Sequence, residues 1–377
     1  MLNKLKKAIR LIPYVLPLGA PQELRQVWVS LLYRSNIGYL GLYILSRYLW
    51  TPLQGIIGAV TSRESKNKNA TILAKEGISE FYYSFFNLHQ PEFWIQRSNY
   101  LYHQSLRHCL YSLSNSEQSQ LLNDKIKFAN HCKVNKLNSP AVILENNTTE
   151  NVEELWSRQQ DFIVKPIRGH QSRGFSLYEY LSNADSYLCY SRTESPVMIQ
   201  SVNDLNHQFS KLKEPSIIQE RIANHGQLER YSNGSLIVIR ILSILNPDNE
   251  VEAFRPLIMI PRADMITADI EKGASTYSID LKTGHIGTSL INLLEFETSA
   301  ELPMWSELVE LVKVAHQTLK EIPLIGWDIA ITEDGPTIIE GNTSPSLDIH
   351  QLPPYAPFIG SRFYELFMYN LAGKTDS

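Results

Sequence analysis

The pattern of apolar and polar residues changes in character near residue 121. Before this point, aromatic-rich stretches such as "EFYYSFFNLHQPEFW" indicate mostly helical structure, and the polar segment at 61–70, "TSRESKNKNA", is the best linker candidate in the first third of the chain. After it, short runs rich in β-branched residues predict strands. These runs are "DFIVKP", "PSIIQERI", "GSLIVIRILSIL" and "EVEAFRPLIMI".

Two segments among these strands carry helix signals. The segment "NDKIKFANHC" begins at Asn123 and Asp124, either of which is a suitable N-cap. Residues 302–320 place four apolar side chains on one helical face, namely Leu308, Leu311, Val312 and Ala315. Because strands and helices are interspersed without a strict βαβ order, we expect an α+β fold with antiparallel sheets.

The stretch "GWDIAITEDGPTIIEGNTSPSLDIHQ", residues 326–351, contains two apolar runs on either side of a turn. In an extended strand, alternate side chains share a face. Asp328 therefore shares a face with Ala330 and Thr332 in the first run. By the same rule, Glu340 shares a face with Ile338 and Asn342 in the second run.

The length of the turn decides whether the two acidic side chains meet. A two-residue Asp-Gly loop would pair residue 328 with residue 341 and would direct Glu340 to the opposite side. A three-residue loop, 333–335, pairs Asp328 with Glu340 and places Gly335 at the third position, where a left-handed backbone is favoured. We therefore expect the three-residue loop, with the Cβ atoms of Asp328 and Glu340 about 5 Å apart.

Two carboxylates that face each other repel unless a positive charge lies between them. A hard divalent cation supplies that charge, and Asn342 adds a neutral oxygen ligand. Mg²⁺ is usually held by one or two carboxylates together with substrate phosphates, so we expect Mg²⁺ here, with Mn²⁺ as the alternative ion. The competing interpretation is a surface hairpin with solvated charges, but four isoleucines make the ribbon too apolar for that: Ile329, Ile331, Ile338 and Ile339.

A phosphate-binding segment is expected upstream if a nucleotide accompanies the metal. Lys165 ends the strand "DFIVKP" and is a compact point charge suited to a phosphate. The segment after it contains two glycines, Gly169 and Gly174, which let backbone N–H groups approach phosphate oxygens. It also contains three basic side chains, Arg168, His170 and Arg173.

The strand "PSIIQERI" ends in Gln219, Glu220, Arg221 and Ile222. A strand edge at this point can bind an adenine through its backbone groups. The carboxylate of Glu220 can then accept a hydrogen bond from the exocyclic amine.

Composition and charge narrow the class of protein. The 377 residues are enough for two or three domains, and the net charge of −4 gives no reason to expect a nucleic acid partner. Residues 1–60 contain seven basic side chains and one acidic side chain, a net +6, which leaves −10 on the rest of the chain. Three cysteines are too few for a disulfide framework and indicate a reducing compartment.

The basic N-terminal region has two interpretations. The apolar stretch "NIGYLGLYILSRYLW" is shorter than the roughly 20 residues that a membrane span requires. Residues 1–60 therefore either form helices that pack on the main domain or lie on an anionic membrane surface. We expect a cytoplasmic protein, with the inner face of the membrane as the alternative location.

The order of these motifs resembles the ATP-grasp superfamily between about residue 121 and residue 350. The shared features are a lysine in an early helix, a strand lysine before a glycine-containing loop, the "QERI" linker and the terminal "EGN" with its preceding Asp328. The segments "LIVIRI", "YSIDLKTGHIG" and "EGNTSPSLDIHQ" look like the sugar-transfer-associated ATP-grasp group, which is associated by prediction with cell-surface polysaccharide synthesis. The resemblance implies two α+β lobes that clasp ATP, at 121–222 and 223–377, after a mostly helical region at 1–120.

The resemblance also implies roles for individual residues. Lys125 and Lys165 would bind the ATP phosphates, with Lys127 as the alternative to Lys125. The adenine would contact the linker, and the ribose contact stays open among His225, Gln227 and Glu229. Further implied roles are metal binding by Asp328, Glu340 and Asn342, phosphate contacts by Arg240 and Lys272, and an acceptor site bordered by Ser344 and Ser346. Arg240 could instead be paired with an acid, and Lys272 could be solvated.

The implied activity is that of an ATP-dependent ligase. A substrate carboxylate would attack the γ-phosphate, and an amine, thiol or hydroxyl would displace phosphate from the resulting acyl-phosphate. The partners would be a small-molecule or sugar-linked carboxylate and an amine acceptor. The alternatives are a small-molecule or sugar kinase on the same scaffold and a non-catalytic nucleotide-binding partner of a glycan assembly.

Overall fold

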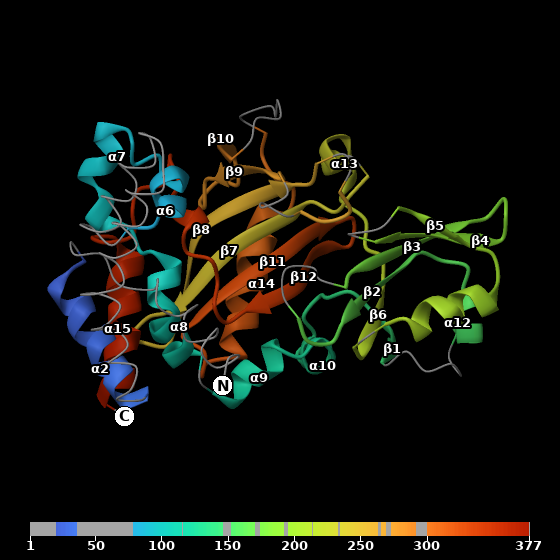
Figure 1. Cartoon of the computed structure of the whole chain (residues 1–377), viewed down its shortest axis with the longest axis horizontal. Coiled ribbons are helices and arrows are strands. Elements are labelled where there is room, and N and C mark those ends of the chain that lie inside the picture. Colours follow the sequence, from blue (N-terminus) through green and yellow to red (C-terminus); the bar gives the residue numbers. More distant parts are fainter. Residues whose placement is uncertain are drawn as a thin grey trace, which may run out of the picture. The chain divides into compact units, whose positions relative to one another are not determined.

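The computed structural model of the chain is shown in Figure 1, and it describes residues 20–35, 78–114, 116–145, 152–169, 174–191, 195–212, 214–232, 234–262, 265–268, 273–291 and 300–376. The described residues fall into two compact units. Unit 1 takes its residues from Met1–Asn115, Ile244–Asp248 and Ser344–Ser377, and unit 2 takes its residues from Ser116–Ser243 and Asn249–Thr343. The polar segment 61–70, expected to be a linker, lies outside the described residues.

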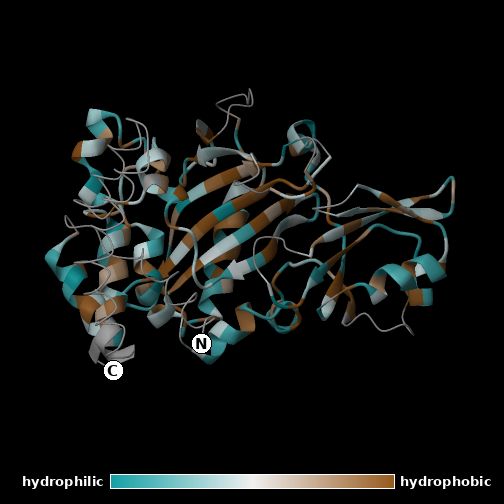
Figure 2. Cartoon of the chain, in the orientation of Figure 1, coloured by the Kyte–Doolittle hydropathy of each residue, from teal (hydrophilic) through white to brown (hydrophobic). Residues whose placement is uncertain are grey.

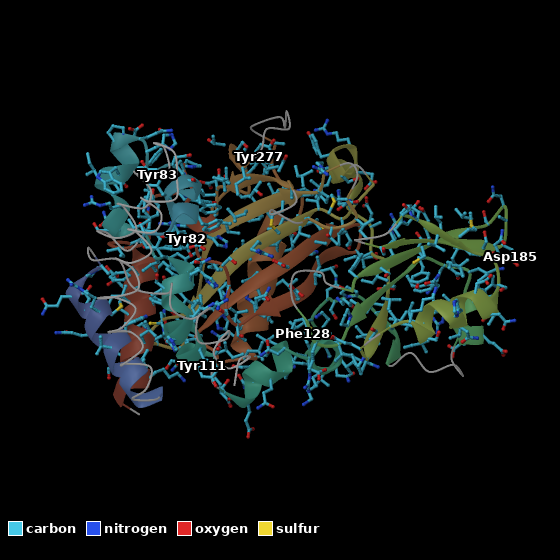
Figure 3. The ribbon with its side chains drawn as sticks, viewed as in Figure 1. Tyr82, Tyr83, Tyr111, Phe128, Asp185 and Tyr277 are labelled. Atoms are coloured by element: carbon cyan, nitrogen blue, oxygen red, sulfur yellow. The ribbon has the colours of Figure 1, made fainter. Side chains whose placement is uncertain are left out.

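Unit 2 contains a six-stranded sheet, here called sheet A, with the strand order β1-β6-β2-β3-β4-β5 and antiparallel pairing. Its strands are β1 (Val142–Glu145), β2 (Phe162–Pro166), β3 (Ser176–Leu181), β4 (Ser186–Ser191), β5 (Val197–Ile199) and β6 (Ser216–Glu220). The predicted strands "DFIVKP" and "PSIIQERI" are thus confirmed as β2 and β6. Figure 3 shows Asp185 at the tip of the β3–β4 hairpin, where it accepts a hydrogen bond from the Tyr180 hydroxyl.

Two helices cover one face of sheet A, α11 (Val152–Ser157) and α12 (Val202–Ser210). Leu155, Leu205 and Phe209 from these helices are buried against sheet residues. Phe162 on β2 stacks on Tyr178 on β3, with ring centroids 4.6 Å apart. This apolar layer fixes β2, which carries Lys165.

A second six-stranded sheet, sheet B, has the order β10-β9-β8-β7-β11-β12. Its strands are β7 (Val238–Leu245), β8 (Val251–Ile260), β9 (Ser275–Ile279), β10 (Ile286–Ile291), β11 (Leu324–Thr332) and β12 (Gly335–Asn342). Helices of unit 2 accompany it: α9 (Glu117–Leu122), α10 (Lys125–Val134), α13 (Gly226–Ser232) and α14 (Trp305–Gln317). The expected α+β fold with antiparallel sheets, and the helix expected within 302–320, are confirmed.

The N-terminus of α10 follows one of the two expected caps. The Asp124 carboxylate accepts a hydrogen bond from the backbone N–H of Lys127 at 3.2 Å. Phe128, labelled in Figure 3, lies on the buried side of this helix and contacts the Trp327 ring of β11 at a centroid distance of 6.4 Å. Lys125 is therefore the first residue of a helix anchored on sheet B.

Alternation along the strands of sheet B separates the core from the opposite face. Figure 2 shows hydrophobic residues alternating with more polar ones along these strands. On β7 and β11 the core residues are Ile239, Ile241, Ile325, Trp327, Ile329 and Ile331, which pack with Leu308, Val312 and Ala315 of α14. Because successive side chains point to opposite faces of a strand, Arg240 and Asp328 share the other face.

The β11–β12 hairpin pairs Asp328 with Glu340 as expected, but its turn and its register differ from the prediction. The expected three-residue loop is wrong: Thr332 pairs with Gly335, which leaves a two-residue turn, and the Thr332 hydroxyl donates to the Gly335 carbonyl oxygen at 2.9 Å. The register then shifts between Ile329 and Asp328, with Ile339 as the additional residue on β12. This bulge brings Asp328 opposite Glu340, as expected.

Two positions in this hairpin require glycine, Gly335 for its backbone conformation and Gly341 for close packing. Gly335 has a φ of +117°, a conformation that glycine adopts far more readily than other residues. A Cβ atom at Gly341 would lie 3.0 Å from a methyl carbon of Leu122 and 3.1 Å from the Trp327 ring. The glycine between Glu340 and Asn342 therefore allows α9 and Trp327 to pack closely on β12.

A buried polar network joins β7, β11 and α14. The indole N–H of Trp327 donates to the Ser243 hydroxyl at 2.8 Å, and Ser243 contacts His316 Nδ1 at 2.6 Å. His316 Nε2 contacts the carbonyl oxygen of Ile322 at 2.8 Å, so Nε2 carries the proton and Ser243 donates to Nδ1. Burial lowers the pKa of His316 to about 4, which keeps the ring neutral. Satisfied networks of this kind specify one packing arrangement.

The described part of unit 1 is helical, as expected for the N-terminal region. Its elements are α2 (Gln22–Ser35), α6 (Glu80–Phe85), α7 (Pro91–Ile95), α8 (Arg107–Leu113) and α15 (Arg362–Asp376), with the 3₁₀ turns η2 (Arg97–Asn99), η3 (His103–Leu106) and η6 (Ile349–Gln351). Helices α2, α8 and α15 pack against one another. None of the described helices has the length and apolar character needed to cross a bilayer. The expected membrane contact of residues 1–60 falls mostly outside the described residues.

The end of the chain belongs to unit 1. The buried Gln351 side chain accepts hydrogen bonds from the N–H groups of Leu101 and Phe358 and donates to the Leu101 carbonyl oxygen. Asp348 accepts a hydrogen bond from the Tyr82 hydroxyl, and burial raises the pKa of Asp348 to about 7. Residues from 344 onward thus pack with N-terminal helices, although the sequence pattern placed them in a lobe at 223–377; the boundaries of the three expected regions stay predictions.

The stability of the protein should fall as the pH decreases from about 6.5 to about 4, in part because of His316. Its folded-state pKa is lowered, so protons bind preferentially to the unfolded chain in this window. The contribution is at most about 3 kcal/mol. Urea denaturation at several pH values should show a smaller pH dependence in His316→Asn than in the natural chain.

The exposed His89 provides the matched control. His89→Asn should keep the pH dependence of the natural chain, because its side chain is not buried. An unchanged pH dependence in His316→Asn would contradict the assignment of this buried ring.

Candidate functional site

Arg240 on β7 and Asp328 on the neighbouring strand β11 form a two-point ion pair. Arg240 Nε lies 2.7 Å from Asp328 Oδ1, and Arg240 Nη2 lies 2.7 Å from Asp328 Oδ2. Burial would lower the pKa of Arg240, but Asp328 and, more weakly, Glu340 raise it, and the net direction is upward. Both oxygens of Asp328 are thus engaged in a two-point ion pair. This pairing was the alternative considered for Arg240 in the sequence.

The three predicted metal ligands lie on the paired strands β11 and β12. Asp328 is opposite Glu340, and Asn342 Nδ2 donates to Glu340 Oε1 at 3.3 Å. Within the described ranges, no three side chains drawn from His, Cys, Asp and Glu form a metal-binding group. A set of two carboxylates and one amide still suits Mg²⁺, because hard cations accept neutral oxygens beside carboxylates. Metal binding by these three residues stays a prediction.

Lys165 brings a positive charge from sheet A to Glu340. It is the penultimate residue of β2, and its side chain is buried. Desolvation lowers the pKa of Lys165 to about 8; Lys125 also lowers it, whereas the attraction of Glu340 raises it. The ammonium therefore lies within electrostatic reach of both side chains, and the two sheets contribute opposite charges to one region of unit 2.

The structure distinguishes Lys125 from Lys127, the two candidates for the phosphate-binding lysine of the early helix. Lys125 Nζ donates to the carbonyl oxygen of Gly169 at 3.2 Å, and its backbone N–H donates to the Ile167 carbonyl oxygen at 3.1 Å. Lys127 is exposed, two residues further along the helix. The geometry therefore favours Lys125 as the partner of Lys165.

The glycine segment after β2 is described at its two ends. Gly174 has a φ of +73°, and a Cβ atom there would lie 2.8 Å from Pro166 Cγ. Arg168 is largely exposed and lies 3.5 Å from the Asp124 carboxylate. His170 and Arg173 lie outside the described residues, as does Lys272, so the expected phosphate contacts of Arg173 and Lys272 stay predictions.

The side chains of the linker after β6 have partners within the protein. Glu220 Oε1 accepts a hydrogen bond from the Ala141 N–H at 2.8 Å. Arg221 forms ion pairs with Asp161 at 2.8 Å and with Glu179 at 3.4 Å. These contacts fix the strand end at Glu220 and Arg221. The backbone N–H groups of Glu220 and Arg221 also have partners, the carbonyl oxygens of Ala141 at 3.1 Å and Asp161 at 3.4 Å.

Gln219 differs from its neighbours. Its Nε2 donates to the Pro140 carbonyl oxygen at 3.2 Å, while its buried Oε1 has no hydrogen-bond partner among the described residues. Ile222 is half-buried just beyond the strand. Of the linker side chains, Gln219 therefore has an acceptor still to be satisfied.

The three candidates for the ribose contact lie at the start of α13. His225 donates its backbone N–H to the Ile331 carbonyl oxygen at 2.7 Å, and Glu229 accepts a hydrogen bond from Asn224 at 3.2 Å. Gln227 lines a cavity of about 320 Å³ with Arg230, Tyr231, Glu301 and others. The geometry leaves the choice among the three open.

Asp161 and Glu179, the partners of Arg221, were not predicted from the sequence. Asp161 immediately precedes β2 and Glu179 lies on β3, so their carboxylates come together only after these strands pair. A signal was present, because Asp161 immediately precedes an apolar strand and its Oδ1 accepts a hydrogen bond from the Tyr180 N–H. Neither residue is close to Arg221 in sequence.

Comparison with family models gives one match, described as sugar-transfer associated ATP-grasp, over residues 105–359. No curated relative matches the chain.

Several solved structures match this chain at low identity. D-alanyl-alanine synthetase A from Vibrio cholerae is 14% identical, with a TM-score of 0.41, over 69% of this chain and 67% of that chain. D-alanine-D-alanine ligase from Helicobacter pylori is 13% identical, with a TM-score of 0.41, over 68% of this chain and 62% of that chain. The ATP-grasp ligase PsnB complexed with a minimal precursor is 15% identical, with a TM-score of 0.39, over 70% of this chain and 64% of that chain. The chain thus spans between 62% and 67% of the length of these three proteins.

Gly174→Ala should destabilise the protein. An L-residue with this positive φ is disfavoured by about 1–2 kcal/mol, and its Cβ atom would press on the Pro166 ring. Gly373→Ala in α15 is the matched control, because the residue is helical and no described atom lies within 4 Å of the point that its new methyl group would occupy. This change should be neutral or stabilising. Thermal unfolding of both variants tests the contrast. Equal melting temperatures for Gly174→Ala and the natural chain would contradict it.

Proposed function

The chain belongs to the sugar-transfer associated ATP-grasp family, and from this premise we propose that it is an ATP-dependent carboxylate–amine ligase that works through an acyl-phosphate. The family model covers residues 105–359, so both sheets of unit 2 lie within it. The same match identifies the α+β architecture described above as the ATP-grasp fold, and ATP-grasp proteins bind ATP.

One observation carries the proposal: the buried Lys165 of sheet A lies within electrostatic reach of Glu340 of sheet B and of Lys125 at the start of α10. Lys125 and Glu340 both act on the pKa of Lys165, and Glu340 also acts on that of Arg240. Buried lysines with a lowered pKa are concentrated at functional sites. Three cations beside two carboxylates and an amide suit a triphosphate and its divalent ion.

The proposed roles follow from these positions. Lys125 and Lys165 hold the phosphates, and the backbone after β6 holds the adenine. Arg240 offers a planar fork that fits a phosphate as well as a carboxylate. Asp328, Glu340 and Asn342 would hold Mg²⁺, with Mn²⁺ as the alternative. When bound, the ion would offset the repulsion between a carboxylate and the triphosphate.

The proposed reaction has two transfers. A carboxylate oxygen of the substrate attacks the γ-phosphorus, the bond to the β–γ bridging oxygen breaks, and ADP leaves. An amine nitrogen then attacks the acyl carbon, inorganic phosphate leaves with the bonding electrons, and the amine loses a proton. The protein contributes by positioning the reactants and by stabilising charge rather than by forming a covalent bond. A thiol or a hydroxyl could replace the amine in the second transfer.

The family description supports a substrate class as well. Sugar-transfer association is the ground for proposing a sugar-linked or other small-molecule carboxylate and a role in cell-surface polysaccharide synthesis. The direct test is a mass-spectrometric screen for condensation products formed from ATP, carboxylates and amines. A product that is phosphorylated but not condensed would replace the ligase with a kinase.

Glu340→Gln should lower ATP turnover by about 100-fold or more, because removing one preorganised charge from the reacting centre costs about that much. Binding of a non-hydrolysable ATP analogue should weaken far less, since the lysines remain. Glu310→Gln, on the exposed side of α14, is the matched control and should leave both quantities unchanged. Turnover in Glu340→Gln equal to that of the control would refute the role of Glu340.

The affinity for the ATP analogue should fall as the pH rises through about 8. Lys165 is charged below its pKa of about 8 and loses its charge above it, so its attraction for phosphate disappears. Lys165→Met should bind about 10–100-fold more weakly at pH 7, which corresponds to the loss of one charged hydrogen bond. This variant should also lack the decrease between pH 7 and pH 9. Fluorescence titrations at pH 7, 8 and 9 measure both effects, and a parallel decrease in the two proteins would assign it to another group.

A further inference from the structure

The proposed role of Asp328 as a metal ligand competes with its observed role as the ion-pair partner of Arg240. As a metal ligand, it must offer at least one oxygen to a cation. In the structure, both of its oxygens accept hydrogen bonds from Arg240, each at 2.7 Å. The side chains of Asp328 and Arg240 are only 10% and 23% exposed, so water cannot readily replace either partner.

We propose that Arg240 is an internal counter-ion that occupies Asp328 until a nucleotide is present, so that divalent metal binding at Asp328, Glu340 and Asn342 depends on nucleotide binding. The inference rests on the proposed function, because it assumes that these three residues form the metal site. It goes beyond that function by assigning an order of events: Arg240 moves from the carboxylate to a phosphate, and Asp328 then becomes a metal ligand.

The charges in this region support such an exchange. Arg240, Lys165 and Lys125 carry three positive charges, whereas Asp328 and Glu340 carry two negative charges. A divalent cation that arrives alone therefore approaches a region with an excess of positive charge. A triphosphate reverses this balance, because it adds several negative charges beside the same three cations.

The geometry of the guanidinium also supports the exchange. A guanidinium fork makes two parallel hydrogen bonds with a carboxylate, and it can make the same pair with a phosphate. Arg240 can therefore exchange Asp328 for a phosphate and keep a two-point partner. A buried carboxylate that loses its partner is strongly unfavourable unless a cation replaces it. Phosphate and metal are thus needed together, and by thermodynamic linkage each should tighten the binding of the other.

A fixed structural ion pair is the alternative. If Arg240 never leaves Asp328, Asp328 is not a metal ligand in the nucleotide complex, and Asp328→Asn alone should leave the Mn²⁺ affinity measured with a non-hydrolysable ATP analogue unchanged. If Arg240 is an exchangeable counter-ion, Asp328→Asn should weaken Mn²⁺ binding in the presence of that analogue, and removal of Arg240 should expose a carboxylate that binds a divalent ion without any nucleotide. The two accounts therefore differ in the effect of Asp328→Asn.

The experiment measures Mn²⁺ binding to the full chain by electron paramagnetic resonance of the free ion, with and without a non-hydrolysable ATP analogue. In the natural chain, the analogue should tighten Mn²⁺ binding at least tenfold beyond the chelation of Mn²⁺ by the analogue alone, which is measured without protein. Arg240→Met should bind Mn²⁺ alone at least tenfold more tightly than the natural chain does, and the analogue should add little. Adding Asp328→Asn to Arg240→Met should abolish this gain, which places the ion at Asp328.

Arg240→Lys is a more conservative second variant, which keeps the test possible if Arg240→Met does not fold. A lysine keeps the charge but loses the two-point fork, so it should bind Mn²⁺ alone with an intermediate affinity. Far-ultraviolet circular dichroism confirms that each variant is folded. Failure of the analogue to bind the natural chain would refute the proposed function, whereas the comparison of Mn²⁺ alone between the natural chain and the Arg240 variants decides the inference. The inference is overturned if Mn²⁺ binds these proteins with equal affinity.

Discussion

The pairing of Arg240 with Asp328 across β7 and β11 is the constraint around which the candidate site is organised. Two opposite charges can remain nearly buried on a sheet only if each satisfies the other. The same two strands supply the apolar core through their alternate residues, Ile239 and Trp327 among them. The packing that stabilises the fold therefore also fixes the positions of the charges, and a change in strand register would disturb both at once.

Two devices hold that register. The first is the network of Ser243, His316 and Trp327, which ties β7, β11 and α14 together beneath Asp328. The second is the bulge at Ile339, which turns Glu340 toward Asp328 after a two-residue turn that would otherwise have separated them. Both lie next to the charged residues, and bulges often re-aim side chains near functional sites. The geometry of the candidate site thus depends on neighbouring residues that are not themselves among its charged side chains.

The charges of unit 2 come from two sheets with different tasks. Sheet A and the start of α10 contribute the amines of Lys165 and Lys125, and sheet B contributes the carboxylates together with Arg240. Neither set is suited to remain alone, because desolvation lowers the pKa of Lys165 and unpaired carboxylates are costly to bury. The arrangement is therefore suited to a ligand that carries both negative charge and a cation.

The sequence by itself determined the main elements of the fold, the alternation that separates core residues from Arg240 and Asp328, and the family through its ordered motifs. It also paired Asp328 with Glu340, although through a three-residue turn that the structure does not contain. Only the tertiary structure decided the bulge at Ile339, the partner of Arg240 and the contacts of Arg221 with Asp161 and Glu179. The physical reason is that periodicity and turn propensity are local properties of the chain. The pairing of charges on strands far apart in sequence depends on register, packing and burial, which are settled only when the sheets assemble.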